Sequence, residues 1–84
     1  MPWFYFDVLH DGDEVTRDHK GTGLAGMKAA RVHALGIWRR IIEEQAAAGQ
    51  DPRHLNVAIL DIHGTVLALV PYPTGPDGKA CALG

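Results

Sequence analysis

The chain has 84 residues, which is the size of one small domain with a limited core. Hydrophobic residues make up 46% of it and charged residues 21%, a composition that excludes intrinsic disorder. The formal net charge of −2 gives no overall positive field, so nucleic acid and anionic lipid are not the expected partners.

Cysteine content and hydropathy indicate the compartment. The single cysteine, Cys81, cannot form an internal disulfide or a cysteine-based zinc site. The N-terminal residues lack the basic and apolar regions of a signal peptide. The longest apolar run, near residues 65–72, is about a third of the ~20 residues that a membrane-spanning helix requires. The sequence therefore predicts a soluble cytoplasmic protein.

A β-hairpin is predicted at the start of the chain. Residues 3–10 are rich in aromatic and β-branched side chains, a turn follows at Asp11-Gly12, and residues 14–18 return as a shorter, more polar strand. Strand alternation places Phe4, Phe6 and Val8 on one face, and this uniformly apolar row is the better core candidate. Residues 20–26 form a connector with several glycines.

One long amphipathic helix is predicted over residues 27–48. It begins after Gly26, and it ends where Gly49 suits the first position beyond a helix and Pro52 prevents continuation. At 100° per residue, the apolar side chains of this segment share one broad arc that is expected to be buried. The arc contains Met27, Ala30, Ala34, Leu35, Ile37, Trp38, Ile41 and Ile42.

A second hairpin follows the helix, with strands at residues 55–60 and 65–70 and a turn at residues 61–64. Its alternation is poor, because both faces of both strands are apolar. The order ββαββ predicts an α+β fold: a four-stranded, mostly antiparallel sheet with one long helix packed on one face. This domain covers residues 1–72, and residues 73–84 are predicted to be a flexible C-terminal tail.

A single helix covers only one face of the predicted sheet, and the other face is also apolar. We expect an exposed hydrophobic patch there, and hence a homodimer or a complex with another protein. Alternatively, strand twist and the tail cover this face within a monomer. The predicted partner-binding residues of the outer face are Trp3, Tyr5, Leu9, Ala58, Leu60, Leu67 and Leu69.

Positive charge is concentrated in residues 19–42, which contain five cations and no acid. The alternative function is therefore a nucleic-acid-binding or antitoxin-like regulator that uses Lys28, Arg39 and Arg40. These three side chains make no single stripe on the helix, and the two arginines are spaced to pair with glutamates four residues later.

One helix residue, Arg31, falls inside the apolar arc, where a guanidinium requires a polar partner or must extend to solvent. We expect a structural ion pair between Arg31 and Asp61, with Asp18 as the other candidate partner.

Residue types that carry catalysis are scarce. The five histidines lack the spacing of a metal site. The acidic turn at residues 11–14 resembles a calcium loop, but Thr22 stands where that loop needs a glutamate. The chain has no serine, and its threonines lack an activating motif. We therefore predict no metal, no cofactor, no small-molecule substrate and no enzymatic activity.

Several short motifs occur in a fixed order along the chain. They are the Pro2-Trp3-Phe4-Tyr5-Phe6-Asp7-Val8 opening with Asp11-Gly12, Asp18-x-x-Gly21-Thr22-x-Leu24, Ala29-Ala30-Arg31, and Asp61-x-x-Gly64-x-Val66-Leu67 leading to Val70-Pro71-Tyr72. Together these motifs resemble a family of small bacterial proteins catalogued as a domain of unknown function, whose members typically open Met-Pro-Arg-Tyr-Phe-Phe and close on Val-Pro-Phe.

The resemblance covers residues 1–72 and implies a small cytoplasmic bacterial protein without an assigned activity. The chain departs from the family pattern at Trp3, where a basic residue is usual, and at Gly26, where an Asp or Ser cap is common. The predicted architecture is also similar to that of the partner-binding antitoxins of the HicB type, which pack a helix on a small antiparallel sheet. That likeness is one of fold alone.

Overall fold

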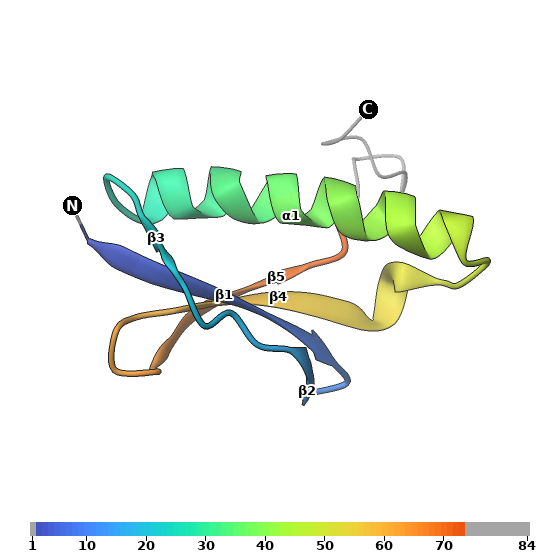
Figure 1. The fold of residues 1–84 in the computed structure, drawn as a ribbon, viewed down its shortest axis with the longest axis horizontal. Coiled ribbons are helices and arrows are strands. Elements are labelled where there is room, and N and C mark those ends of the chain that lie inside the picture. Colours follow the sequence, from blue (N-terminus) through green and yellow to red (C-terminus); the bar gives the residue numbers. More distant parts are fainter. Residues whose placement is uncertain (1, 74–84) are drawn as a thin grey trace.

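The computed structural model of the chain describes residues 2–73. It confirms an α+β fold in which one long helix lies on an antiparallel sheet (Figure 1). The predicted tail lies, apart from Pro73, outside the described residues. The elements are β1 (Trp3–His10), β2 (Asp13–Thr16), β3 (Thr22–Gly23), α1 (Met27–Ala47), a short 3-10 helix η1 (Pro52–His54), β4 (Leu55–Leu60) and β5 (Val66–Pro71).

The sheet has the strand order β2-β1-β4-β5, and β3 is an additional short strand that pairs with β1. β3 lies in the predicted connector, so the sheet has five strands where four were expected. β2 pairs with the end of β1 at Val8, Leu9 and His10, whereas β3 pairs with its start at Trp3 and Phe4. One edge of β1 is therefore shared by two short strands with a gap between them.

The helix α1 crosses one side of the sheet (Figure 1). Its predicted ends are confirmed to within one residue: it starts after Gly26, which supplies no side-chain cap, and stops before Gly49. Gly49 adopts φ +70°, and its N–H donates to the Ala46 carbonyl, the arrangement expected just beyond a helix. The residues of α1 that are buried against the sheet are Ala30, Ala34, Trp38 and Ile41.

The core lies between this helix stripe and the inner face of the sheet. Phe4 and Phe6 are buried there as predicted, and Val8 packs against the same cluster from a half-buried position. From β4, the alternate residues Leu55, Val57 and Ile59 join them. Trp38 is fully buried in this core.

The indole of Trp38 is also tied to the last strand. Its Nε1 donates to the Val70 carbonyl at 2.8 Å, so the one polar atom of the side chain has a partner in the interior. The ring of Tyr72 packs edge-on against the Trp38 ring, with centroids 5.8 Å apart. These contacts fix β5 beneath the second half of α1.

A β-bulge changes the alternation of β5. Ile59 pairs with Ala68, but the next residue of β4, Leu60, pairs with Val66, so β5 contains one extra residue at this point. Residues directly opposite one another share a face, and Val66 therefore lies on the outer face with Leu60. A strict period of two would place Val66 on the inner face with Ala68 and Val70, so the bulge moves it to the opposite face.

Trp3 and Gly21 form a close contact where the connector runs beside the start of β1. The Trp3 Nε1 donates to the Lys20 carbonyl at 3.1 Å. Gly21 adopts φ +72°, and a Cβ at this position would overlap the Trp3 indole nitrogen and approach the Phe4 carbonyl oxygen. The connector can therefore lie against β1 only because residue 21 has no side chain.

We predict that Gly21→Ala destabilises the domain more than Gly12→Ala does. Both glycines have positive φ, which costs about 1 kcal/mol or more for alanine. Only Gly21 adds a clash, worth about 1–3 kcal/mol, because a Cβ at Gly12 meets no atom within 4 Å. Urea unfolding monitored by tryptophan fluorescence measures both free energies. Equal losses in the two variants would show that the Trp3 contact places no constraint on residue 21.

Candidate protein-interaction surface

The outer face of the sheet is the side opposite α1, and the strand register divides it into three rows. The first row runs from Tyr5 through Leu60 to Val66. The second runs from Asp7 through Ala58 to Leu69, and the third from Leu9 through Asn56 to Pro71. Each row therefore begins on β1 in the middle of the sheet and ends on β5 at its edge.

In each row the most exposed residue is the one on β5. In the middle row Asp7 is 6% exposed and Ala58 is 1% exposed, whereas Leu69 is 53% exposed. The expectation that Ala58 forms part of an exposed patch was wrong: its side chain is small and lies between the longer side chains of its cross-strand partners, Asp7 and Leu69. Tyr5, Leu9 and Leu60 are half-buried.

Among residues 2–73, the exposed large hydrophobic side chains concentrate in the β4–β5 hairpin. Leu67 and Leu69 were predicted at this surface, while Ile62 in the turn and Val66 just before the bulge were not. Trp3 is 46% exposed, but its indole nitrogen already donates to the connector. Four exposed apolar residues therefore lie at the β5 side, and we call them the β5 strip: Ile62, Val66, Leu67 and Leu69.

The opposite edge of the sheet is closed by Asp18. Its Oδ2 accepts a hydrogen bond from the Phe6 N–H at 3.1 Å, in the gap between β2 and β3. Its Oδ1 accepts from the N–H groups of Lys20 and Gly21, both at 3.0 Å. Partial burial acts to raise the pKa of the Asp18 carboxyl, but the three backbone N–H donors outweigh it and hold this pKa below its ordinary value.

A groove of about 240 Å³ lies on the covered half of the outer face, between the connector and the β4–β5 turn. Three carboxylates line it, but their oxygens accept backbone hydrogen bonds: Asp7 from the Asp18 N–H, Asp18 from its own turn, and Asp61 from the N–H groups of His63 and Thr65. The groove contains no serine, cysteine or histidine. These acids therefore hold the backbone of two turns, and no nucleophile stands beside them.

The predicted ion pair between Arg31 and Asp61 is absent from the described part of the chain, and Arg31 makes none with Asp18. Arg31 is exposed instead of lying in the buried arc. The Asp61 Oδ1 already accepts two backbone N–H groups, at 2.8 and 2.9 Å. The two carboxylate oxygens of Asp18 together accept three. An exposed guanidinium keeps its hydration without a partner, so no pairing is required.

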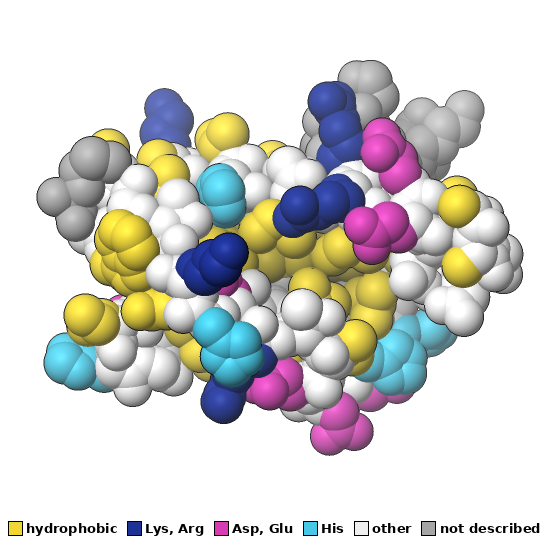
Figure 2. All heavy atoms as spheres, viewed as in Figure 1, with side chains coloured by type: hydrophobic (Ala, Val, Ile, Leu, Met, Phe, Trp, Pro, Cys, Tyr) yellow, Lys and Arg dark blue, Asp and Glu magenta, His cyan; other side chains and the backbone are white. Residues whose placement is uncertain are grey.

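The basic residues of the alternative function lie exposed on α1. Lys28 stands in its first turn, and Arg39 and Arg40 in its second half. In Figure 2, Lys and Arg side chains are spread along the helix, and the acidic side chains lie together toward one end of it. Nucleic-acid binding by these residues stays a prediction.

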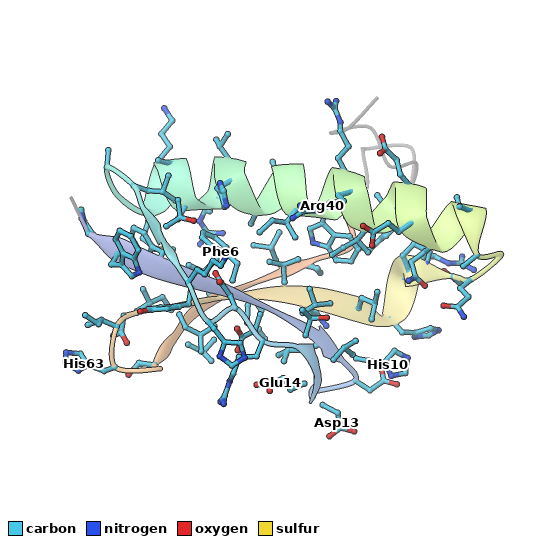
Figure 3. All side chains as sticks on the ribbon, in the orientation of Figure 1. Phe6, His10, Asp13, Glu14, Arg40 and His63 are labelled. Carbon is cyan, nitrogen blue, oxygen red and sulfur yellow. The ribbon has the colours of Figure 1, made fainter. Side chains whose placement is uncertain are left out.

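The first hairpin and the second turn lie far apart. Figure 3 shows His10, Asp13 and Glu14 at one end of the sheet and His63 at the other. Within residues 2–73, no three His, Cys, Asp or Glu side chains come together as ligands for a metal ion.

A second hollow lies on the helix side of the molecule. Figure 2 shows hydrophobic side chains at its base and charged side chains along the helix above it. The hollow holds about 310 Å³ between α1 and β2, and its base includes Val8, Ile37 and Ile41. Sequence reasoning missed it. The one sequence feature that could have indicated it is Val15, an apolar residue in an otherwise polar strand. Val15 is 59% exposed at the rim of the hollow.

A family model matches residues 3–73, which is nearly the whole described chain. The model is that of a domain of unknown function, DUF6894. The chain belongs to this family. The resemblance inferred from the short motifs is thereby confirmed, and the DUF6894 family brings no activity with it. No curated protein and no solved structure matches the chain.

Two motifs that carried the resemblance have a common structural role. In Asp18-x-x-Gly21 and in Asp61-x-x-Gly64, the aspartate accepts backbone N–H groups of its own turn and the glycine has positive φ, +72° and +80°. The DUF6894 motifs are therefore turn motifs in this chain. No helix among the described residues has the length and apolarity to cross a membrane.

We predict that Asp18→Asn lowers the free energy of unfolding by about 1–3 kcal/mol at pH 7, because an amide presents one acceptor where the carboxylate presents two. The folded pKa lies below the unfolded value of 3.8, so this contribution is complete above pH 3.8 and is lost as pH falls through the folded pKa. Urea unfolding at several pH values measures the difference.

The matched control is Asp13→Asn in β2, whose side chain is exposed and accepts none of the hydrogen bonds found in residues 2–73. This variant should match the wild type at every pH. A difference between wild type and Asp18→Asn that stays constant down to about pH 2 would contradict the role of the carboxylate.

Proposed function

We propose that this DUF6894 domain is a non-catalytic homodimerisation module. The observation that carries the proposal is the β5 strip, in which Val66 is 51% exposed, Leu67 44% and Leu69 53%. Large exposed apolar patches on soluble proteins mark sites of association, and four exposed apolar residues of one hairpin are the best candidate for such a site in residues 2–73. The strip lies in one hairpin at one border of the sheet, so a single partner can cover it.

Hydrogen bonds within the described groove support a structural role for its acids. Asp7, Asp18 and Asp61 each accept backbone N–H groups and so hold the two turns beside the groove. A domain of this size with one helix layer also gains stability from association, since its own core is small. Cytoplasmic location is part of the proposal, because a chain with one cysteine needs no oxidising compartment.

We predict that Leu69→Glu raises the dissociation constant of the dimer at least about 100-fold, because dimerisation would bury an unpaired carboxylate. The matched control is Val32→Glu, which places the same charge at a residue that is 65% exposed on α1. Light scattering at micromolar concentration should give two chains for the wild type and for Val32→Glu, and one chain for Leu69→Glu. A wild-type mass of one chain would overturn the proposal.

A further inference from the structure

We infer that the groove on the outer face of the sheet binds a guanidinium group carried on an aliphatic stem, with the Asp7 carboxylate as its main partner. This site does not depend on the proposed dimer. Three features of the groove support it: a buried carboxylate with one unused oxygen, an excess of negative charge, and an apolar wall beside the acids.

Asp7 is a charged residue in a buried position, with an exposure of 6%. Its Oδ1 accepts the Asp18 N–H at 2.9 Å. Its Oδ2 accepts no hydrogen bond, and the side chain forms no ion pair within residues 2–73. A buried carboxylate with one donor and no counter-ion costs free energy, which a cation from outside would offset.

The unused oxygen of Asp7 is accessible. No fully buried side-chain oxygen or nitrogen within residues 2–73 lacks a hydrogen-bond partner, so the Oδ2 of Asp7 must reach the surface. Asp7 lines the groove, and the groove is therefore where a ligand meets this oxygen. The buried position of the side chain fixes the carboxylate before any ligand arrives, which lowers the entropy cost of binding.

Negative charge exceeds positive charge around the groove. Asp18 and Asp61 line it together with Asp7, and Arg17 is the cationic lining residue. The Arg17 Nε lies 3.4 Å from the Glu14 Oε2, so its charge is shared with an acid outside the groove. Both backbone donors to Asp61 meet its Oδ1, which leaves the Oδ2 of Asp61 as a second unused acceptor within residues 2–73.

The remaining wall of the groove is apolar. Tyr5 and Leu60 line it from half-buried positions, and Ile62 lines it from the turn. Methylene groups of a long cationic side chain pack against such residues, and a tyrosine ring attracts the cation at its end. The volume of about 240 Å³ is below the ~300–1,000 Å³ of sites for drug-sized molecules, so one side chain or a small amine derivative fits.

The two unused oxygens favour a guanidinium over other cations. They belong to separate carboxylates, Asp7 on β1 and Asp61 in the β4–β5 turn. A guanidinium presents five N–H donors in one plane and can bond to both acids, and it is less strongly hydrated than an ammonium group. A metal ion needs a converging ligand set, which the side chains of residues 2–73 do not form.

The test is an NMR titration of the full chain with n-butylguanidinium chloride, and n-butylammonium chloride at equal concentration is the matched probe. The guanidinium should shift the amides of residues 5–7 and 61–64, and the ammonium should bind more weakly. Asp7→Asn should weaken guanidinium binding at least about 10-fold, the cost of losing a charge-assisted hydrogen bond. Asp13→Asn, exposed on β2, should bind as the wild type does.

Three results would overturn the site: no shift at these amides in the wild-type chain, equal affinity for the two cations, or equal affinity in wild type and Asp7→Asn. A blocked Ala-Arg-Ala peptide identifies the source of the guanidinium. Tighter binding of the peptide assigns it to an arginine of a partner protein, and tighter binding of n-butylguanidinium assigns it to a small molecule. Either order supports the site.

The stability of the ligand-free chain separates binding by Asp7 from a purely structural role. An asparagine at this position still offers an oxygen to the Asp18 N–H, so the variant keeps the contact that holds the connector. Removing a buried charge without a counter-ion should move the midpoint of urea unfolding to a higher concentration. A lower midpoint for Asp7→Asn would show that the fold itself uses the charge, and it would overturn the site.

Discussion

The hydrogen bond from the Phe6 N–H to the Asp18 carboxylate determines how this small sheet ends. β1 lies second in the spatial order of the sheet. Neither β2 nor β3 is long enough to pair with the whole of its outer edge. Because Asp18 takes the central N–H, the chain can pass from β2 to β3 along the same edge of β1 without exposing an unpaired donor. The Asp18 N–H in turn donates to Asp7 at 2.9 Å, which ties this segment to an outer-face side chain of β1.

The outer face has two halves of different character. On the β1 side, Asp7 and Ala58 are buried, and a polar groove lies between the two turns. On the β5 side, nothing within residues 2–73 lies over Leu69, and the strip remains apolar and exposed. A single helix covers one face of the sheet, so the outer face depends on its own loops and side chains for cover.

The main elements could be predicted because their signals are local. The period of α1, the glycine that follows it and the aromatic alternation of β1 each depend on neighbouring residues alone, and the structure agrees with all three. The family resemblance was also recoverable, since the Asp-x-x-Gly turns are set by residues within four positions of each other.

The remainder depends on contacts between distant residues. β3 forms because Gly21 permits a close approach to Trp3, which no helical or strand period encodes. The bulge opposite Leu60 transfers Val66 to the outer face, and one additional residue shifts the alternation of everything that precedes it in the strand. Arg31 is exposed although its neighbours Ala30 and Ala34 are fully buried, so the buried stripe of α1 is narrower than the arc drawn on a helical wheel.

The two edges of the sheet differ in what meets their outward-facing backbone donors. At β1, an unpaired backbone donor meets a carboxylate from the chain itself, and charged residues flank it. At β5, the donor of Leu69 meets no group of residues 2–73, and its neighbours are aliphatic. The β5 edge instead carries Pro71 at one end and a bulge at the other, two features that limit strand pairing without the use of charge. The same small sheet therefore ends in a carboxylate cap on one side and in a proline and a bulge on the other.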